Sequence, residues 1–247
     1  MDWPVALVVA AAGYLIGSIS SARLVVRLRH ADVDITRIEV PLESGEVFVS
    51  DSVSASAVRL TLGPRLGILT ALLDMAKVAI PTLAVRLWAP EEPYFLIVAA
   101  AGLVGHVLPL YHGFRGGRGE SAIYGGLLVI DPLAVVGTTI LGMALGFLVG
   151  NILVLRWAGM VLLIPWLWLA TGSPWFLAYI VFVDAVYLLA MRPELGQYAT
   201  MRGSGTDPTN EEIAIEFGMG RRLGRALDRY APIPALLRRL RGTTGAE

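Results

Sequence analysis

Long apolar runs, separated by short polar segments, dominate the pattern of this chain. The runs occupy residues 4–22, 66–88, 94–111, 121–150 and 157–190. A helix needs ~20 apolar residues to cross a bilayer, because the hydrocarbon core is about 30 Å thick. The runs are too long, and alternate too poorly, for the strands of a membrane barrel. The pattern therefore predicts an all-α integral membrane protein.

Two of the runs are too long for a single crossing. Asp131-Pro132 divides 121–150 into two helices, of which the first is short and rich in glycine. The stretch Thr171–Pro174, which reads TGSP, divides 157–190 in the same way. We therefore expect about seven transmembrane helices, two or three of them short or tilted.

Composition agrees with this pattern. Hydrophobic residues make up 55% of the chain and charged residues 16%, whereas a soluble domain carries roughly a quarter charged residues. The mean hydropathy is +0.66. The chain has no cysteine, which excludes disulfides and thiolate chemistry. The formal net charge is zero, and we expect no nucleic-acid partner.

The charges are distributed unevenly along the chain. Acidic residues precede the first run and follow the second, whereas basic residues follow the first, third, fifth and last helices. Loops rich in lysine and arginine stay in the cytoplasm. With seven helices, this bias places the N-terminus outside and the C-terminus in the cytoplasm. The protein is then a multi-pass protein of the inner (plasma) membrane.

Two segments lie outside the expected membrane helices. Residues 30–62 alternate polar and apolar positions, and we expect short strands or an irregular loop there, on the cytoplasmic face. The polar tail, 193–247, has Thr209 or Asn210 as a helix cap. Its later leucines and arginines predict basic amphipathic helices on the anionic inner leaflet. We therefore divide the chain into a membrane domain, 1–192, and this cytoplasmic tail.

The stretch GHVLPLYHGFRGGRGES, 105–121, is the strongest candidate for chemistry. Glycines permit positive φ, so successive amide groups can point at one anion ahead of the next helix. The planar guanidinium group of arginine can donate two parallel hydrogen bonds to phosphate oxygens. The alternative is a basic cytoplasmic turn without a ligand, since lysine and arginine are generally enriched in the cytoplasmic loops of membrane proteins. The candidate phosphate-binding residues of this loop are Arg115, Gly116, Gly117, Arg118 and Gly119.

An ionisable pair lies deep in the second run. Asp74 and Lys77 are three residues apart and share a helix face, about 15 Å from the start of the helix. Such a pair faces a cavity or the bundle interior, as a binding site or as a structural ion pair. Lys77 and His106 join the candidate binding residues. Since no carboxylate joins His106 at the spacing of metal ligands, we expect no metal site.

Glycines also mark the first run. Gly13 and Gly17 are four residues apart, a spacing that favours close packing of two membrane helices. This interpretation needs no ligand, and it predicts that the first helix closely approaches a neighbour.

Three stretches of the chain resemble motifs of the bacterial acyl-phosphate:glycerol-3-phosphate acyltransferase family. They are YLIGSISSA (14–22), LDMAKVAIP (73–81) and GHVLPLYHGFRGGRGESA (105–122). The resemblance covers roughly residues 4–192, and the third motif is the most specific. It implies a seven-helix membrane enzyme with a cytoplasmic active site. Such an enzyme moves an acyl chain from acyl phosphate to the 1-hydroxyl of glycerol 3-phosphate, with no cofactor.

The chain departs from this family at the motif GSGNxGATNxxR. Without gaps, that motif falls on 49–60, where Ser50 matches its serine and both of its asparagines are replaced. Arg59 lies one place before its arginine. An alternative alignment uses Ser44-Gly45 and an insertion. The resemblance implies that Ser50 and Arg59 are candidate catalytic residues.

Two further departures concern proton transfer. The family has HRENI after the last helix, whereas this chain has Met191 in place of the histidine and Glu194 in place of the asparagine. The third motif carries a new carboxylate, Glu120, where the family has valine. Glu120 either replaces the missing base or repels a phosphate, and it is the third candidate catalytic residue.

These observations favour a membrane acyltransferase of phospholipid synthesis. Its expected partners are acyl phosphate, glycerol 3-phosphate or a related phosphorylated acceptor, and membrane lipid. The alternative is a catalytically degenerate relative that binds a phosphorylated lipid precursor or a partner protein. A transporter is favoured less, because the chain shows no inverted repeat. The acyltransferase hypothesis predicts that Lys77 and the Gly116–Gly119 loop converge on one pocket.

Overall fold

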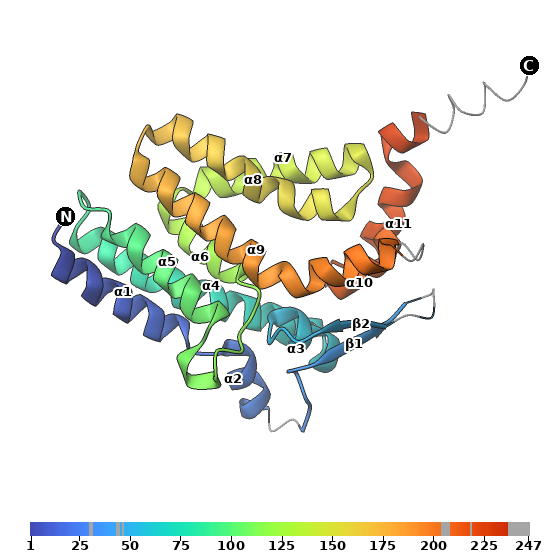
Figure 1. Cartoon of the computed structure of the whole chain (residues 1–247), viewed down its shortest axis with the longest axis horizontal. Coiled ribbons are helices and arrows are strands. Elements are labelled where there is room, and N and C mark those ends of the chain that lie inside the picture. The colour runs from blue at the N-terminus through green and yellow to red at the C-terminus, as the bar shows by residue number, and fades with distance from the viewer. Residues whose placement is uncertain (30–31, 43–44, 46, 204–207, 218, 237–247) are drawn as a thin grey trace, which may run out of the picture.

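The computed structural model describes residues 1–29, 32–42, 45, 47–203, 208–217 and 219–236 (Figure 1). Within this part the chain is mostly helical. The α-helices are α1 (Trp3–Gly17), α2 (Ser21–Leu28), α3 (Ala55–Leu62), α4 (Pro64–Trp88), α5 (Tyr94–Val107), α6 (Glu120–Ile130), α7 (Pro132–Val149), α8 (Ile152–Thr171), α9 (Pro174–Gly203), α10 (Asn210–Glu216) and α11 (Arg221–Tyr230). A short 3-10 helix, η1 (Leu110–His112), and two strands, β1 (Ile38–Pro41) and β2 (Val47–Ser50), complete the described elements.

Six described helical segments are long and apolar enough to cross a membrane. They are Trp3–Leu28, Pro64–Trp88, Tyr94–His112, Pro132–Val149, Ile152–Thr171 and Pro174–Met201. The seventh expected helix, α6, has 11 residues, which at 1.5 Å per residue is about 16 Å and too short to cross alone. The prediction of a helical membrane protein is confirmed, and the number of membrane crossings stays a prediction.

The expected breaks between helices occur for identifiable reasons. The Asp131 side chain accepts a hydrogen bond of 2.9 Å from the Ala134 amide and so caps α7, with Pro132 in the first turn. Gly172 ends α8 with a φ of 60°, a left-handed conformation that glycine adopts at little cost. Both breaks were predicted from these residue types.

Helices α1 and α5 pack closely against each other. A Cβ atom at Gly17 would lie 2.2 Å from the Gly102 carbonyl oxygen, and one at Gly13 would lie 2.6 Å from that of Val98. A Cβ at Gly105 would lie 2.2 Å from the Tyr14 carbonyl oxygen. The packing predicted for Gly13 and Gly17 is therefore confirmed. Figure 1 shows α1, α4 and α5 side by side, with the α7–α8 hairpin joined to them through α6 and α9.

The two ends of the bundle differ in charge, as the sequence predicted. At one end, the N-terminal amino group forms an ion pair of 3.2 Å with Glu92, and the Asp2 amide donates to the Tyr94 hydroxyl at 2.7 Å. At the other end, the Arg23 guanidinium donates to the Arg115 carbonyl at 3.0 Å. The direction in which the bundle crosses the membrane stays a prediction.

The segment 30–62 contains both strands and a helix. β1 and β2 pair antiparallel, with Ile38 opposite Ser50, so the expectation of short strands is confirmed. α3 was not predicted. It begins where the Ser54 side chain accepts from the Ala57 amide at 3.3 Å. Ser44, used by the alternative motif alignment, lies outside the described residues.

The tail packs against the membrane helices. Thr209 and Glu212 form a reciprocal capping box that starts α10, so the predicted cap is confirmed. Ala214 of α10 and Leu227 of α11 are fully buried in the main hydrophobic core. α9 continues through Pro193 to Gly203, and the division into 1–192 and 193–247 stays a prediction. Part of the last arginine-rich stretch, 237–247, lies outside the described residues.

Candidate functional site

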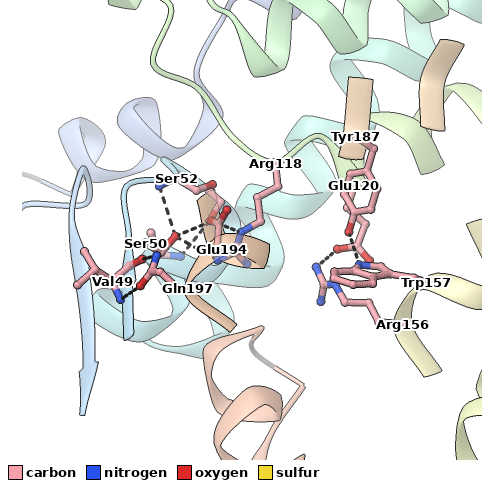
Figure 2. A network of polar contacts seen from close by, with 12 residues as sticks. Val49, Ser50, Ser52, Arg118, Glu120, Arg156, Trp157, Tyr187, Glu194 and Gln197 are labelled. Atoms are coloured by element: carbon pink, nitrogen blue, oxygen red, sulfur yellow. Dashed lines mark hydrogen bonds and ion pairs between the residues drawn. The ribbon is translucent and has the colours of Figure 1, made fainter. Parts of the chain in front are cut away.

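Three side chains from distant segments meet in one buried cluster (Figure 2). The Arg118 Nε donates to the Glu194 Oε1 at 3.1 Å, and its Nη2 donates to the Ser50 Oγ at 3.1 Å. The Ser50 hydroxyl in turn donates to the same Glu194 oxygen at 3.1 Å. The sequence separations are 68 residues between Ser50 and Arg118 and 144 between Ser50 and Glu194. We call this group the Arg118 cluster.

All members of the Arg118 cluster are shielded from solvent. Exposure is 7% for Ser50, 5% for Arg118 and 3% for Glu194. Burying a charged pair is costly, and removing one partner alone leaves an uncompensated charge that destabilises strongly. The cluster therefore couples three segments energetically, and each segment depends on the other two.

A side-chain amide on α9 holds β2 in the register that this cluster needs. The Val49 amide donates to the Gln197 Oε1 at 2.9 Å, and the Gln197 Nε2 donates back to the Val49 carbonyl at 2.6 Å. Gln197 and Glu194 are three residues apart and share a face of α9. Because Ser50 directly follows Val49, this pairing places its hydroxyl beside Glu194 (Figure 2).

A second buried cluster centres on Asp74. Its Oδ1 lies 2.9 Å from the Lys77 Nζ and 3.4 Å from the His106 Nδ1. The Lys77 ammonium also donates to the Ile19 carbonyl at 2.8 Å. We call this group the Asp74 cluster. The ionisable pair predicted deep in the second helix therefore faces the bundle interior, against the connection between α1 and α2.

A small cavity of about 10 Å³ borders the Asp74 cluster. Its walls include Lys77 and His106 together with Gly116 and Gly117 of the glycine-rich loop. The predicted convergence of Lys77 with this loop is therefore found for these two glycines. The volume is on the scale of one water molecule.

The glycines let the loop lie directly on His106. A Cβ at Gly116 would lie 2.1 Å from the His106 carbonyl oxygen, and one at Gly117 would lie 2.3 Å from its Nε2. The Gly117 amide donates to that carbonyl at 3.2 Å. Gly119, which immediately precedes α6, has a φ of 101°, a backbone conformation that glycine tolerates best. Close packing therefore accounts for these residues structurally, and phosphate binding by the loop stays a prediction.

The arginines of the loop point in different directions. The Arg118 side chain enters the Arg118 cluster, whereas Arg115 is exposed and contributes its carbonyl to Arg23. The cavity at Lys77 is lined by neither Arg115 nor Arg118. The reason is that Gly116 and Gly117 press against His106, so the residues on either side project away from the Asp74 cluster.

The other two candidate catalytic residues lie outside both clusters. Glu120 forms an ion pair with Arg156 of α8, beside Tyr187, whose hydroxyl accepts from the Trp157 Nε1 at 3.1 Å (Figure 2). Arg59 of α3 is half-buried and faces the tail, since a Cβ at Gly220 would lie 3.9 Å from its guanidinium. Their assignment as catalytic residues stays a prediction.

Sequence reasoning did not select two residues that build the Arg118 cluster. Glu194 was noted only as a departure from a motif, although its position in that motif was the signal that could have identified it. Gln197 lies outside the motifs.

Among the described residues, no group of three or more histidine, aspartate or glutamate side chains could hold a metal ion.

An apolar groove of about 650 Å³ runs between α1, α5 and α9. Its wall extends from Leu7 and Pro93 at one end to Tyr14 and Val104 at the other. Tyr14 lies three residues before Gly17, and Val104 lies two residues before His106. Gly17 and His106 line the cavity at Lys77. The groove thus ends within one helical turn of the cavity at Lys77 along α1 and α5, although the two cavities share no lining residue.

Comparison with known sequences identifies one family. A family model described as "Glycerol-3-phosphate acyltransferase" matches residues 7–198. Curated proteins of that name include one from Geobacter sulfurreducens, 32% identical over 53% of this chain and 61% of its own length. One from an Anaeromyxobacter species is 35% identical, over 59% of this chain and 68% of its own length. The match to the first of these relatives thus spans less than two thirds of its length.

Solved structures share the fold. A crystal structure of PlsY, an integral membrane glycerol 3-phosphate acyltransferase, in its glycerol 3-phosphate form has a TM-score of 0.64 at 23% identity. The match covers 82% of this chain and 94% of that one. The lysophosphatidic acid form of PlsY gives a TM-score of 0.65 at 21% identity, over 86% and 99% of the two chains.

Proposed function

Because the chain belongs to the glycerol-3-phosphate acyltransferase family, we propose that it is a plasma-membrane enzyme of phospholipid synthesis. It transfers an acyl chain from acyl phosphate to the 1-hydroxyl of glycerol 3-phosphate, or of a related phosphorylated acceptor. The observation that carries this proposal is the meeting of Ser50, Arg118 and Glu194, from three separate motif regions, at one buried point.

The Arg118 cluster provides the groups that an acceptor needs. The guanidinium and the Ser50 hydroxyl donate hydrogen bonds to the phosphate oxygens of glycerol 3-phosphate. Binding of the phosphate draws Arg118 away from Glu194. The released carboxylate then accepts the proton of the acceptor hydroxyl, as a general base.

The transfer balances without a cofactor. The acceptor oxygen bonds to the carbonyl carbon of the acyl phosphate, and the bond from that carbon to the phosphate oxygen breaks. Phosphate leaves with the bonding electrons, and the hydroxyl proton passes to Glu194. Holding the hydroxyl beside the mixed anhydride supplies most of the rate, because the reaction becomes effectively intramolecular.

The reaction involves two phosphate groups, and each of the two clusters contributes a cation, Lys77 in one and Arg118 in the other. We assign the donor phosphate to Lys77 and the adjoining Gly116–Gly117 segment, since the apolar groove ends within one helical turn of this cavity and suits an acyl chain entering from the bilayer. The cavity has to widen on binding, because a volume of about 10 Å³ does not admit a phosphate. The glycine-rich loop then links the donor at Lys77 to the acceptor at Arg118.

The direct test supplies purified protein with acyl phosphate and radiolabelled glycerol 3-phosphate, and then with other polyols and amines. We expect labelled lysophosphatidate from the wild type and its loss in Arg118→Ala. The matched control is Arg86→Ala, which removes a partly buried arginine that donates to the Val129 and Ile130 carbonyls near the α6–α7 junction. Equal losses in the two variants contradict the role of Arg118.

A second candidate function is a catalytically silent relative that binds a phosphorylated lipid precursor. The observation in its favour is Glu194, a carboxylate where the resembled motif has asparagine, since its ion pair with Arg118 competes with an incoming anion. This candidate predicts saturable phosphate binding and no acyl product from any acceptor. It also predicts that Glu194→Asn tightens phosphate binding, whereas the enzymatic proposal predicts that this variant loses turnover.

A further inference from the structure

The family match ends at residue 198, yet the chain that follows is built into the fold. Asn210, at the start of α10, accepts from the Ile152 amide at 2.9 Å and donates to the Gly150 carbonyl at 3.0 Å. Ile213 and Ala214 lie in the main core with 8% and 0% exposure. These contacts fix α10 against the turn between α7 and α8.

This docking places Phe217, the residue after α10, among the charged groups of the candidate site. Phe217 is 5% exposed. Its ring centroid lies 4.9 Å from the Arg118 Cζ and 4.1 Å from the Arg156 Cζ. The Trp157 and Tyr198 rings each lie 6.3 Å from it. One phenyl ring thus contacts two arginines, each of which also pairs with a glutamate.

The ring has a physical effect on the Arg118 side chain. A cation is attracted to an aromatic face, and the attraction is strongest where water is excluded, as it is here. A long arginine side chain also has many rotamers, and packing against a ring restricts them. Phe217 therefore holds the guanidinium in the orientation in which its Nε faces Glu194 and its Nη2 faces Ser50.

We propose that Phe217, on a segment beyond the family match, is a positioning residue for Arg118 in substrate phosphate binding. This inference rests on the proposed function in so far as Arg118 binds the acceptor phosphate. Phe217 acts through Arg118 and does not itself touch the reacting atoms. The same ring contacts Arg156, so it also ties the Glu120–Arg156 pair to the site.

The test compares Phe217→Leu with a matched control, Phe95→Leu. Phe95 is 6% exposed, lies 5.5 Å from the Arg86 Cζ and contacts Phe176 edge-on. Both variants therefore remove a buried phenyl ring that contacts an arginine, and Phe95 lies near the opposite end of the bundle. The measurements are the thermal unfolding midpoint, kcat and KM for glycerol 3-phosphate, and the Kd for inorganic phosphate.

We expect Phe217→Leu to raise KM and the phosphate Kd by about 2- to 30-fold, the range from an exposed to a desolvated cation–π contact, with a smaller change in kcat. Phe217→Tyr, which keeps the ring, restores both constants. Phe95→Leu lowers the unfolding midpoint to a similar extent and leaves KM and Kd at the wild-type values. Should Phe217→Leu not fold, Phe217→Met removes the ring with a more adaptable side chain.

The outcomes separate this inference from the proposed function. Active protein whose KM and phosphate Kd are the same in Phe217→Leu and Phe95→Leu overturns the positioning role and leaves the enzyme intact. Wild-type protein without acyl transfer, but with phosphate binding weakened by Phe217→Leu alone, supports the positioning role and removes the enzymatic proposal.

Discussion

The two buried ionic clusters of this protein are assembled in different ways. In the Asp74 cluster, the carboxylate and the ammonium lie one turn apart on α4, so the helix alone brings them together. In the Arg118 cluster, the hydroxyl, guanidinium and carboxylate come from β2, the loop before α6 and α9. The ion pair of the first cluster needs one helix, whereas the second cluster needs the correct placement of three segments. The Arg118 cluster is therefore the more sensitive to changes elsewhere in the fold.

Removing the arginine has the largest expected effect. Arg118→Ala leaves Glu194 as an uncompensated buried charge, so we expect the free energy of unfolding to fall by about 3–5 kcal/mol. Acyl transfer should fall by about 100-fold or more, the scale for losing a preorganised donor. Thermal unfolding in detergent and the radiolabel assay measure the two effects.

A double variant separates stability from chemistry in that cluster. Arg118→Met with Glu194→Leu replaces both charges by apolar groups of similar size, and such replacements are often neutral for stability. We expect an unfolding midpoint near that of the wild type together with lost acyl transfer. A double variant as unstable as Arg118→Ala would contradict the assignment of that loss to the unpaired carboxylate.

A methyl group at Gly117 tests the Asp74 cluster. Gly117→Ala places a carbon 2.3 Å from the His106 Nε2, and relieving such overpacking costs about 1–3 kcal/mol. We expect lower stability and a higher KM for acyl phosphate, because the loop moves away from Lys77. Gly196→Ala on α9 is the control, since nothing lies within 4 Å of a Cβ there. Equal effects of the two variants would show that contact with His106 does not matter.

Releasing β2 from α9 should affect only the Arg118 cluster. Gln197→Ala removes both hydrogen bonds to Val49 and leaves partly buried backbone groups unpaired, at a cost of about 1–3 kcal/mol. We expect KM for glycerol 3-phosphate to rise and KM for acyl phosphate to stay constant in steady-state kinetics. Thr200→Ala, which removes one exposed hydrogen bond within α9, is the control. A change in both KM values would mean that the two clusters are coupled.

The smallest expected effect concerns the start of α10. Thr209→Ala breaks the capping box with Glu212, which costs about 0.5–2 kcal/mol. Because α10 carries Phe217 towards Arg118, we expect a modest rise in KM for glycerol 3-phosphate, smaller than that of Phe217→Leu. Hydrogen exchange of the α10 amides should report the loosened helix. Unchanged exchange would show that the contacts of Asn210 hold α10 without its cap.

Much of the fold could be predicted from local patterns. Apolar runs of sufficient length identify membrane helices because unpaired backbone groups are excluded from lipid. Pro132 restricts the backbone at the start of α7, and Gly172 adopts the left-handed conformation at the end of α8, so each residue identifies a helix end locally. α3 could not be predicted in this way, because it has only eight residues. A helix this short depends on tertiary packing for its stability.

The candidate site could be predicted only in part. The sequence by itself determined the membrane helices, the uneven charge of the two ends, the Asp74–Lys77 pair and the close approach of glycine-bearing helices, because each depends on residues a few positions apart. Only the tertiary structure decided that Arg118 turns to Ser50 and Glu194 while its neighbours Gly116 and Gly117 press on His106. It also decided that Phe217 of the tail lies against Arg118. The partners of Arg118 lie many tens of positions away in the sequence, and which partner a buried charge finds depends on how whole helices pack.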